Sequence, residues 1–217
     1  MKSFIVLFLL AISMPVEAQT FWCFELQLGY AMSMPTSLII KQKGYNDIKI
    51  NNAEYKTESL NDPLYWSWRI ARWRKNKSIE FEAIHHKFFL QNLPIEVQRF
   101  SVSHVYNMIF LNKGFNVNKT IWRLGLGTTI VHGESTIRNK SYSEGTGFDI
   151  KGHRLRGVGI NLAISKQLKI NRLISWNIES KINAAYAHIP IVNGYAIMPM
   201  MALQIITGPV LIGLCKY

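Results

Sequence analysis

The sequence predicts an all-β protein, a single eight-stranded antiparallel transmembrane β-barrel with short periplasmic turns and longer extracellular loops. Residues 172–188 alternate apolar and polar side chains for as long as a membrane-spanning strand needs, roughly 9 to 11 residues plus rims. Similar alternation recurs along the chain after an export signal. No later stretch has about eighteen consecutive apolar residues, so the sequence excludes a helical membrane protein.

The first residues predict a cleaved secretory signal peptide. Lys2 supplies the positive region, residues 4–12 the apolar region, and residues 16–18 a cleavage site of the expected kind. The apolar run is too short for a transmembrane helix, which disfavours the alternative of an uncleaved anchor. We therefore expect residues 1–18 to be a signal peptide and residues 19–217 to be one barrel domain.

Composition limits the classes of molecule that we expect the protein to bind. The chain has a formal net charge of +12, but an exported protein does not meet nucleic acid, so we expect a basic exterior facing anionic lipopolysaccharide. Cys23 and Cys215 should point to opposite faces, which predicts no disulfide. We expect outer-membrane lipid and lipopolysaccharide as partners, no cofactor and a monomer, while a protein partner stays open.

The first predicted strand covers residues 24–33, with apolar side chains such as Phe24 facing lipid and Glu25 facing the lumen. Pro35 ends the pattern. Residues 37–57 are too hydrophilic for lipid, so we place them as a hairpin, turning near residues 44–47, in the first extracellular loop. Their inclusion in the wall would give nine or ten strands.

Two strands follow around a short periplasmic turn at residues 75–77. Residues 64–73 direct Trp66 and Trp68 outward and Arg69 inward, and residues 78–90 direct Glu80 and Glu82 inward. Because short turns belong to the periplasmic rim, this turn sets the direction of every strand. The next loop, residues 91–97, is then extracellular.

The fourth strand, residues 98–112, has Phe100, Met108 and Phe110 in the phase that we expect to face lipid, and Arg99 in the lumenal phase. A turn is expected around Gly114. The fifth strand, residues 120–132, directs Trp122 outward and Arg123 inward, together with glycines that leave room in a narrow lumen.

The last strands follow the largest predicted loop, the polar residues 133–152. Residues 153–166 form the sixth strand, a turn at residues 169–171 leads to the strand at residues 172–188, and residues 197–217 form the eighth. The eight strands resemble the small outer-membrane barrels of the OmpA- and OmpX-like class, and the terminal Tyr217 is similar to their carboxy-terminal signal. That resemblance implies the bacterial outer membrane and two periplasmic chain ends.

The lumenal phases carry charges of both signs, which we expect to meet across the barrel. This predicted set comprises Glu25, Arg69, Glu80, Glu82, Arg99, Arg123, Glu179 and Lys181. Buried charges require partners, so the set predicts a plug that closes the barrel. The alternative is an ion or proton path.

The six histidines all fall toward the extracellular side in this topology, at positions 85, 86, 104, 132, 153 and 188. Polar aromatic side chains suit a membrane rim. Convergent imidazoles would also suit a divalent metal, but their spacing matches no metal motif, so we predict no metal site.

One short motif suggests an enzyme. Residues 103–107, Ser-His-Val-Tyr-Asn, resemble the His-x-Ser-Asn motif of outer-membrane lipid A 3-O-deacylases. The resemblance implies His104 as general base and Asn107 as an oxyanion helper. Tyr106 occupies the position of the nucleophile, and Ser103 offers the nearest hydroxyl, on the opposite face.

The sequence thus predicts a non-enzymatic outer-membrane barrel with a charge-filled lumen, whose surface loops bind lipopolysaccharide or a partner. A lipid A acyl-ester hydrolase that uses His104 is the alternative. A soluble lipocalin-like barrel is disfavoured, because the apolar phases are long and carry tryptophan and tyrosine near the strand ends.

Overall fold

The computed structural model describes residues 20–61, 64–143 and 155–213, apart from the side chains of residues 103–106. The fold is all-β, and every strand pairing is antiparallel. Nowhere in these ranges does a helix occur that is long and apolar enough to cross a membrane.

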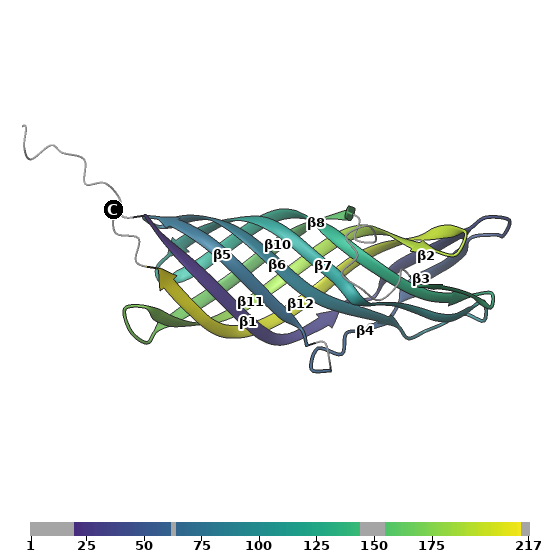
Figure 1. Ribbon diagram of the computed structural model, residues 1–217, viewed down its shortest axis with the longest axis horizontal. Helices are drawn as coiled ribbons and strands as arrows, with labels where there is room; N and C mark the ends of the chain where they lie inside the picture. The colour runs from purple at the N-terminus through teal and green to yellow at the C-terminus, as the bar shows by residue number, and fades with distance from the viewer. Residues whose placement is uncertain (1–19, 62–63, 144–154, 214–217) are drawn as a thin grey trace, which may run out of the picture.

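Eight strands hydrogen-bond to one another in a ring, because β1 pairs with β12 as well as with β5. In order around the ring these strands are β1 (Thr20–Ser33), β5 (Trp66–Arg74), β6 (Lys77–Leu90), β7 (Val97–Val117), β8 (Thr120–Ile137), β10 (Leu155–Lys169), β11 (Ile174–Ile191) and β12 (Gly194–Gly213). The prediction of eight antiparallel strands is confirmed (Figure 1).

The two ends of the ring differ. At one end β1 begins, β12 ends and short turns join neighbouring strands; we call it the short-turn end (Figure 1, left). At the other, the hairpin end, the short strands β2 (Thr36–Gln42), β3 (Ile48–Ala53), β4 (Tyr55–Lys56) and β9 (Lys140–Ser143) extend the sheet outside the ring. The hairpin predicted at residues 37–57 is therefore present, and it pairs with β12 through β2.

Side chains alternate between the outside and the inside of the ring as period-two strands require. On β11, Trp176 and Ile178 are exposed whereas Asn177 and Glu179 are buried, and the same alternation holds along β1, β5, β8, β10 and β12. The outer face is strongly apolar in its middle part, with Leu124, Leu126 and Ile160 among its exposed side chains.

The predicted phase of the fourth strand is wrong. Phe100, Met108 and Phe110 of β7 are buried inside the ring, and Arg99 is exposed. A bulge lies within the strand, because Ser101 pairs with Glu134 of β8 but Val105 pairs with His132, yet Phe100 and Met108 on either side of it are both buried, so it leaves the phase unchanged.

One predicted turn and the start of one predicted loop lie elsewhere. Gly114 is inside β7, and the turn follows at residues 118–119, where both residues have positive φ. A side chain at Gly114 would collide with the Ser78 hydroxyl and the Glu80 carboxylate, so glycine keeps room for a buried acid. The loop expected from residue 133 begins later, because β8 continues to Ile137; residues 144–154 lie outside the described residues.

The interior of the ring is layered. A small apolar cluster that includes Cys23, Trp73 and Val210 fills it toward the short-turn end. Toward the hairpin end a larger apolar cluster includes Phe110 and Met198. Buried charged and amide side chains lie between the two, so the polar layer is enclosed along the ring axis as well as around it.

Candidate functional site

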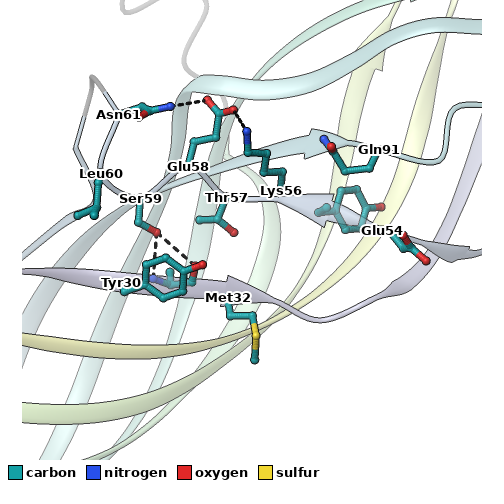
Figure 2. A pocket seen from close by; sticks show the side chains of 12 residues that line it. Tyr30, Met32, Glu54, Lys56, Thr57, Glu58, Ser59, Leu60, Asn61 and Gln91 are labelled. Carbon is teal, nitrogen blue, oxygen red and sulfur yellow. Dashed lines mark hydrogen bonds and ion pairs between the residues drawn. The ribbon is translucent and has the colours of Figure 1, made fainter.

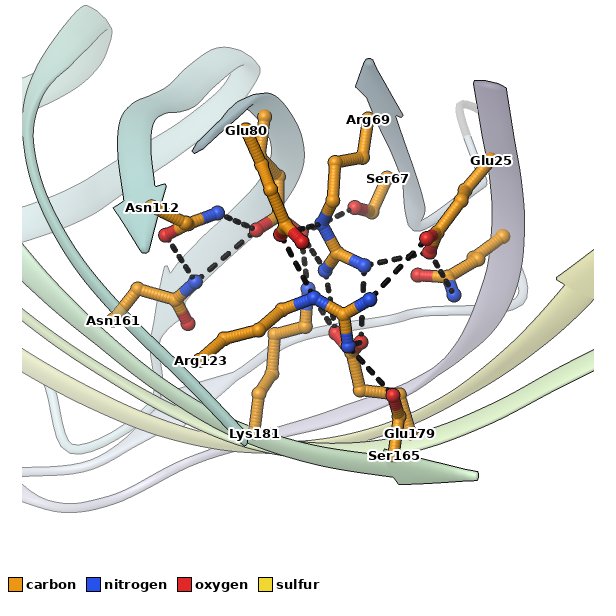
Figure 3. Close-up of polar contacts among 12 residues, drawn as sticks. Glu25, Ser67, Arg69, Glu80, Asn112, Arg123, Asn161, Ser165, Glu179 and Lys181 are labelled. Carbon is orange, nitrogen blue, oxygen red and sulfur yellow. Dashed lines mark hydrogen bonds and ion pairs between the residues drawn. The ribbon is translucent and has the colours of Figure 1, made fainter. Parts of the chain in front are cut away.

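Arg69 is the centre of the buried polar layer (Figure 3). Its guanidinium lies 2.6 Å from Glu25, 2.7 Å from Glu179, 2.9 Å from Glu82 and 3.3 Å from Glu80, and all five side chains are fully buried. Alternation on β1, β5, β6 and β11 directs these residues inward. One cation therefore joins four strands through charge-assisted hydrogen bonds.

Two further cations complete the charged cluster. Arg123 of β8 lies 2.8 Å from both Glu80 and Glu179 and 3.2 Å from Glu25, and it donates a hydrogen bond to the Ser165 hydroxyl at 2.6 Å. Lys181 of β11 contacts Glu82 and lies 2.9 Å from Glu179. We call these seven residues the charge network; its members are Glu25, Arg69, Glu80, Glu82, Arg123, Glu179 and Lys181.

Amide side chains extend the charge network to β7 and β10. Asn112 of β7 and Asn161 of β10 both donate to Glu82, at 2.7 and 3.1 Å, and Asn183 donates to the side-chain Oδ1 of Asn161 at 2.9 Å. The Tyr65 hydroxyl donates to the Gln204 side chain of β12 at 2.5 Å. Polar contacts thus cross the interior in several directions and oppose any widening of the ring.

Four carboxylates face three cations in the charge network, with no water-exposed member. A group of buried charges is stable only when each is paired and hydrogen-bonded, and here the contacts are numerous and short. With apolar clusters on both sides, this layer has the form of a plug rather than of a water-filled path.

Arg99 is the predicted lumenal charge that does not join the charge network. Its side chain is 60% exposed and pairs with Glu134 of β8 at 2.5 Å, at the hairpin end. The reversed phase of β7 explains the difference, since the inward positions at this level are apolar. The sequence did not predict that Asn112 contacts the lumenal charges. Asn161, by contrast, belongs to a strand phase that the sequence shows to be polar.

The hydrolase motif is described only in part. The side chains of Ser103 and His104 lie outside the described residues, so their proposed roles stay predictions. Asn107 Oδ1 lies 3.0 Å from His85 Nδ1, and the His85 ring stacks on Trp66 with centroids 5.5 Å apart. Asn107 therefore contacts a histidine other than the one the motif implies.

The histidines are spread over separate surroundings. His86 contacts the Ser33 hydroxyl at 3.1 Å inside the ring, whereas His188 is exposed and stacks on Tyr195. His132 is buried on β8, and His153 lies outside the described residues. In the described part of the chain, no three His, Cys, Asp or Glu side chains converge as metal ligands would.

A cavity of about 600 Å³ opens beside β1 at the hairpin end (Figure 2). β1 leaves β5 after Leu28, and Ser59 takes over part of the free edge, accepting from the Ala31 amide at 3.0 Å and donating to the Ala31 carbonyl at 3.2 Å. Lys56 lies 2.8 Å from Glu58, and its hydrogen bond lowers the pKa of that carboxyl. The lining is mostly uncharged and holds two acids against one cation, Lys56, which does not suit an anionic ligand.

A basic and aromatic cluster lies at the tips of two hairpins. The Arg138 guanidinium lies 4.5 Å from the centre of the Tyr45 ring, and the Lys140 ammonium lies 5.3 Å from it. Arg138 is held by hydrogen bonds to Gln42 and to the Asn46 carbonyl. Cations beside an aromatic face suit a sugar that carries phosphate.

Comparisons with known proteins agree with this architecture. No protein-family model matches the sequence, and no curated protein matches it. Among solved structures, the chain is similar to the outer membrane protein AlkL, determined by solid-state NMR in DMPC lipid bilayers, with a TM-score of 0.53, 10% identity, and coverage of 94% of this chain and 96% of AlkL.

Weaker matches are Ail, the attachment invasion locus protein of Yersinia pestis, and Neisserial surface protein A. Ail has a TM-score of 0.36 and 10% identity, covering 90% of this chain and 99% of Ail. Neisserial surface protein A has a TM-score of 0.39 and 9% identity, covering 89% and 98%. On the strength of its eight-stranded ring and the similarity to AlkL, this chain has the fold of the small outer-membrane β-barrel proteins.

Proposed function

We propose that the chain is a non-enzymatic integral protein of the bacterial outer membrane, a closed barrel with a plugged interior whose hairpin end binds lipopolysaccharide at the cell surface. The observation that carries this proposal is the pairing of a fully buried charge network with an exposed apolar outer face. Charged side chains inside and apolar side chains outside suit a ring that is surrounded by lipid. Closure of the ring pairs the backbone N–H and C=O groups of its strands, which find no other partners in lipid.

The ends of the ring set its orientation in this proposal. Short turns belong to the periplasmic rim of outer-membrane barrels and long loops to the outside, so the hairpin end faces the medium. The cluster of Tyr45, Arg138 and Lys140 then stands at the height of lipopolysaccharide sugars and phosphates. We assign lipopolysaccharide contact to this cluster rather than to the cavity beside β1, whose lining has more acids than cations.

Removal of the two cations should weaken lipopolysaccharide binding. We expect R138Q/K140Q to lower the affinity for purified lipopolysaccharide roughly thirtyfold at low salt, because each of the two cations near a phosphate surface contributes on the order of 1 kcal/mol. The wild-type affinity should fall as salt rises. Surface plasmon resonance across a salt series measures both.

The matched control is K166Q/K169Q, which removes two exposed cations from the short-turn end. Its affinity should equal that of the wild type. Binding that is independent of salt, or lost equally in both variants, would contradict the assignment.

The plug predicts an electrically silent barrel. We expect the protein, reconstituted into a planar bilayer, to give no steady unitary currents, since paired charges and two apolar clusters fill the interior. Insertion is verified on the same preparation by co-flotation with lipid vesicles. Steady channels from inserted protein would show a continuous aqueous path through the charge network.

A further inference from the structure

The exposed charges at the short-turn end have a single sign. Among the described residues, the exposed charged side chains of this end are Arg72, Arg74, Lys75, Lys77, Lys113, Lys119, Lys166, Lys169 and Arg172. At the hairpin end, by contrast, acidic side chains such as Asp47, Glu58 and Glu134 form ion pairs with basic ones. The positive charge of the protein is therefore concentrated at the end without compensating acids.

Five of these cations surround one cavity. It has a volume of about 530 Å³ and is lined by Arg72, Arg74, Lys75, Lys77 and Lys113, together with Asn76, Ser78 and Ile79. The lining contains no acidic residue. Strand register explains the concentration, because Arg74 pairs directly with Lys77, while Ile79 pairs with Arg72 on one side and with Lys113 on the other.

Like charges opposite one another in a sheet destabilise it unless a counter-charge is near. None of the five cations forms an ion pair within the described part of the chain. A bound anion would relieve this repulsion.

An apolar strip continues from the cavity along the outer face. Ile79 is 57% exposed, and the next outward side chains on β6 and β7, Phe81 and Leu111, are exposed and paired across the strands. The surface therefore offers cations at the rim and hydrocarbon beside them, the order in which a phospholipid presents its phosphate and its acyl chains.

We propose that this surface is a binding site for an anionic phospholipid of the inner leaflet, with the phosphate among Arg72, Arg74, Lys77 and Lys113 and an acyl chain along Ile79, Phe81 and Leu111. The proposal rests on the membrane insertion and orientation given above, which place the short-turn end at the periplasmic rim. Lipopolysaccharide would offer similar phosphates, but in that orientation it lies at the opposite end of the ring.

The test compares two variants that each remove four cations from the same end. R72Q/R74Q/K77Q/K113Q removes four of the five cations around the cavity, and K119Q/K166Q/K169Q/R172Q removes the four that lie away from it. Far-UV circular dichroism verifies that both are folded. Native mass spectrometry from detergent micelles then counts retained phosphatidylglycerol against phosphatidylcholine.

We expect the wild type and the second variant to retain phosphatidylglycerol in preference to phosphatidylcholine, and the first variant to lose that preference by about tenfold or more. An equal loss in both variants would indicate diffuse attraction and overturn the site, as would a wild type without preference. Lipopolysaccharide bound through the same four cations in place of phosphatidylglycerol would overturn the leaflet assignment.

Co-flotation with phosphatidylcholine vesicles separates this inference from the proposed function. Protein that floats with the vesicles but shows no headgroup preference refutes the lipid site alone. Protein that does not float refutes membrane insertion, and the lipid site with it.

Discussion

Replacement of Arg69 by methionine is expected to destabilise the folded protein by about 3–5 kcal/mol, the range for breaking a buried ion pair from one side. Arg69 contacts all four carboxylates of the charge network, so its loss leaves them with Arg123 and Lys181 alone. The methionine fills part of the space but neutralises nothing. Reversible urea unfolding in phosphatidylcholine vesicles, followed by tryptophan fluorescence, gives the free energy of unfolding.

Arg99 provides the matched control for this substitution. R99M also removes an arginine that pairs with a glutamate, but that arginine is largely exposed, and such pairs contribute only about 0–1 kcal/mol. E25Q is a second comparison: carboxylates exceed cations in the charge network, so removing one should cost less than R69M does. An R69M variant as stable as R99M would show that the charge network does not hold the ring together.

Much of the fold was predictable because alternation with period two has a direct physical cause. In β11 the inward phase holds Glu179 and Lys181 and the outward phase holds Trp176 and Ile178, so polarity alone shows which phase of the strand faces inward. The same contrast identified the inward side chains Arg69 and Arg123.

β7 shows where that contrast fails. Both of its phases are apolar around Met108 and Leu111, so polarity could not decide which one faces inward. The inward phase is apolar because the interior itself becomes apolar toward the hairpin end. The bulge between Ser101 and Val105 has no signature in the sequence, but Arg99 on one side of it and Leu111 on the other are both exposed, so it does not alter the phase of the strand.

The membership of the charge network was easier to predict than its contacts. Polarity placed Glu82 inside, but its hydrogen bonds to Asn112 and Asn161 depend on the registers of β6, β7 and β10. Registers depend on where the strands end. The ends of β7 and β8 lie beyond the predicted limits, because these two strands continue to pair past the apolar middle part of the outer face. Side-chain partners across a ring therefore require the structure.

The most direct test of the central claim, that the apolar outer face lies in lipid, is the stability of L126R. Leu126 is 69% exposed in the middle of the outward phase of β8. An arginine there should lower the free energy of unfolding in phosphatidylcholine vesicles by about 2–4 kcal/mol, the cost of a charge near the bilayer midplane.

The control is I95R, in the segment between β6 and β7, where Ile95 is 91% exposed and the charge should cost almost nothing. Our account predicts a large loss of stability for L126R and none for I95R, measured by the same urea titration. An L126R variant as stable as I95R would mean that the apolar face meets water, and it would contradict the transmembrane barrel.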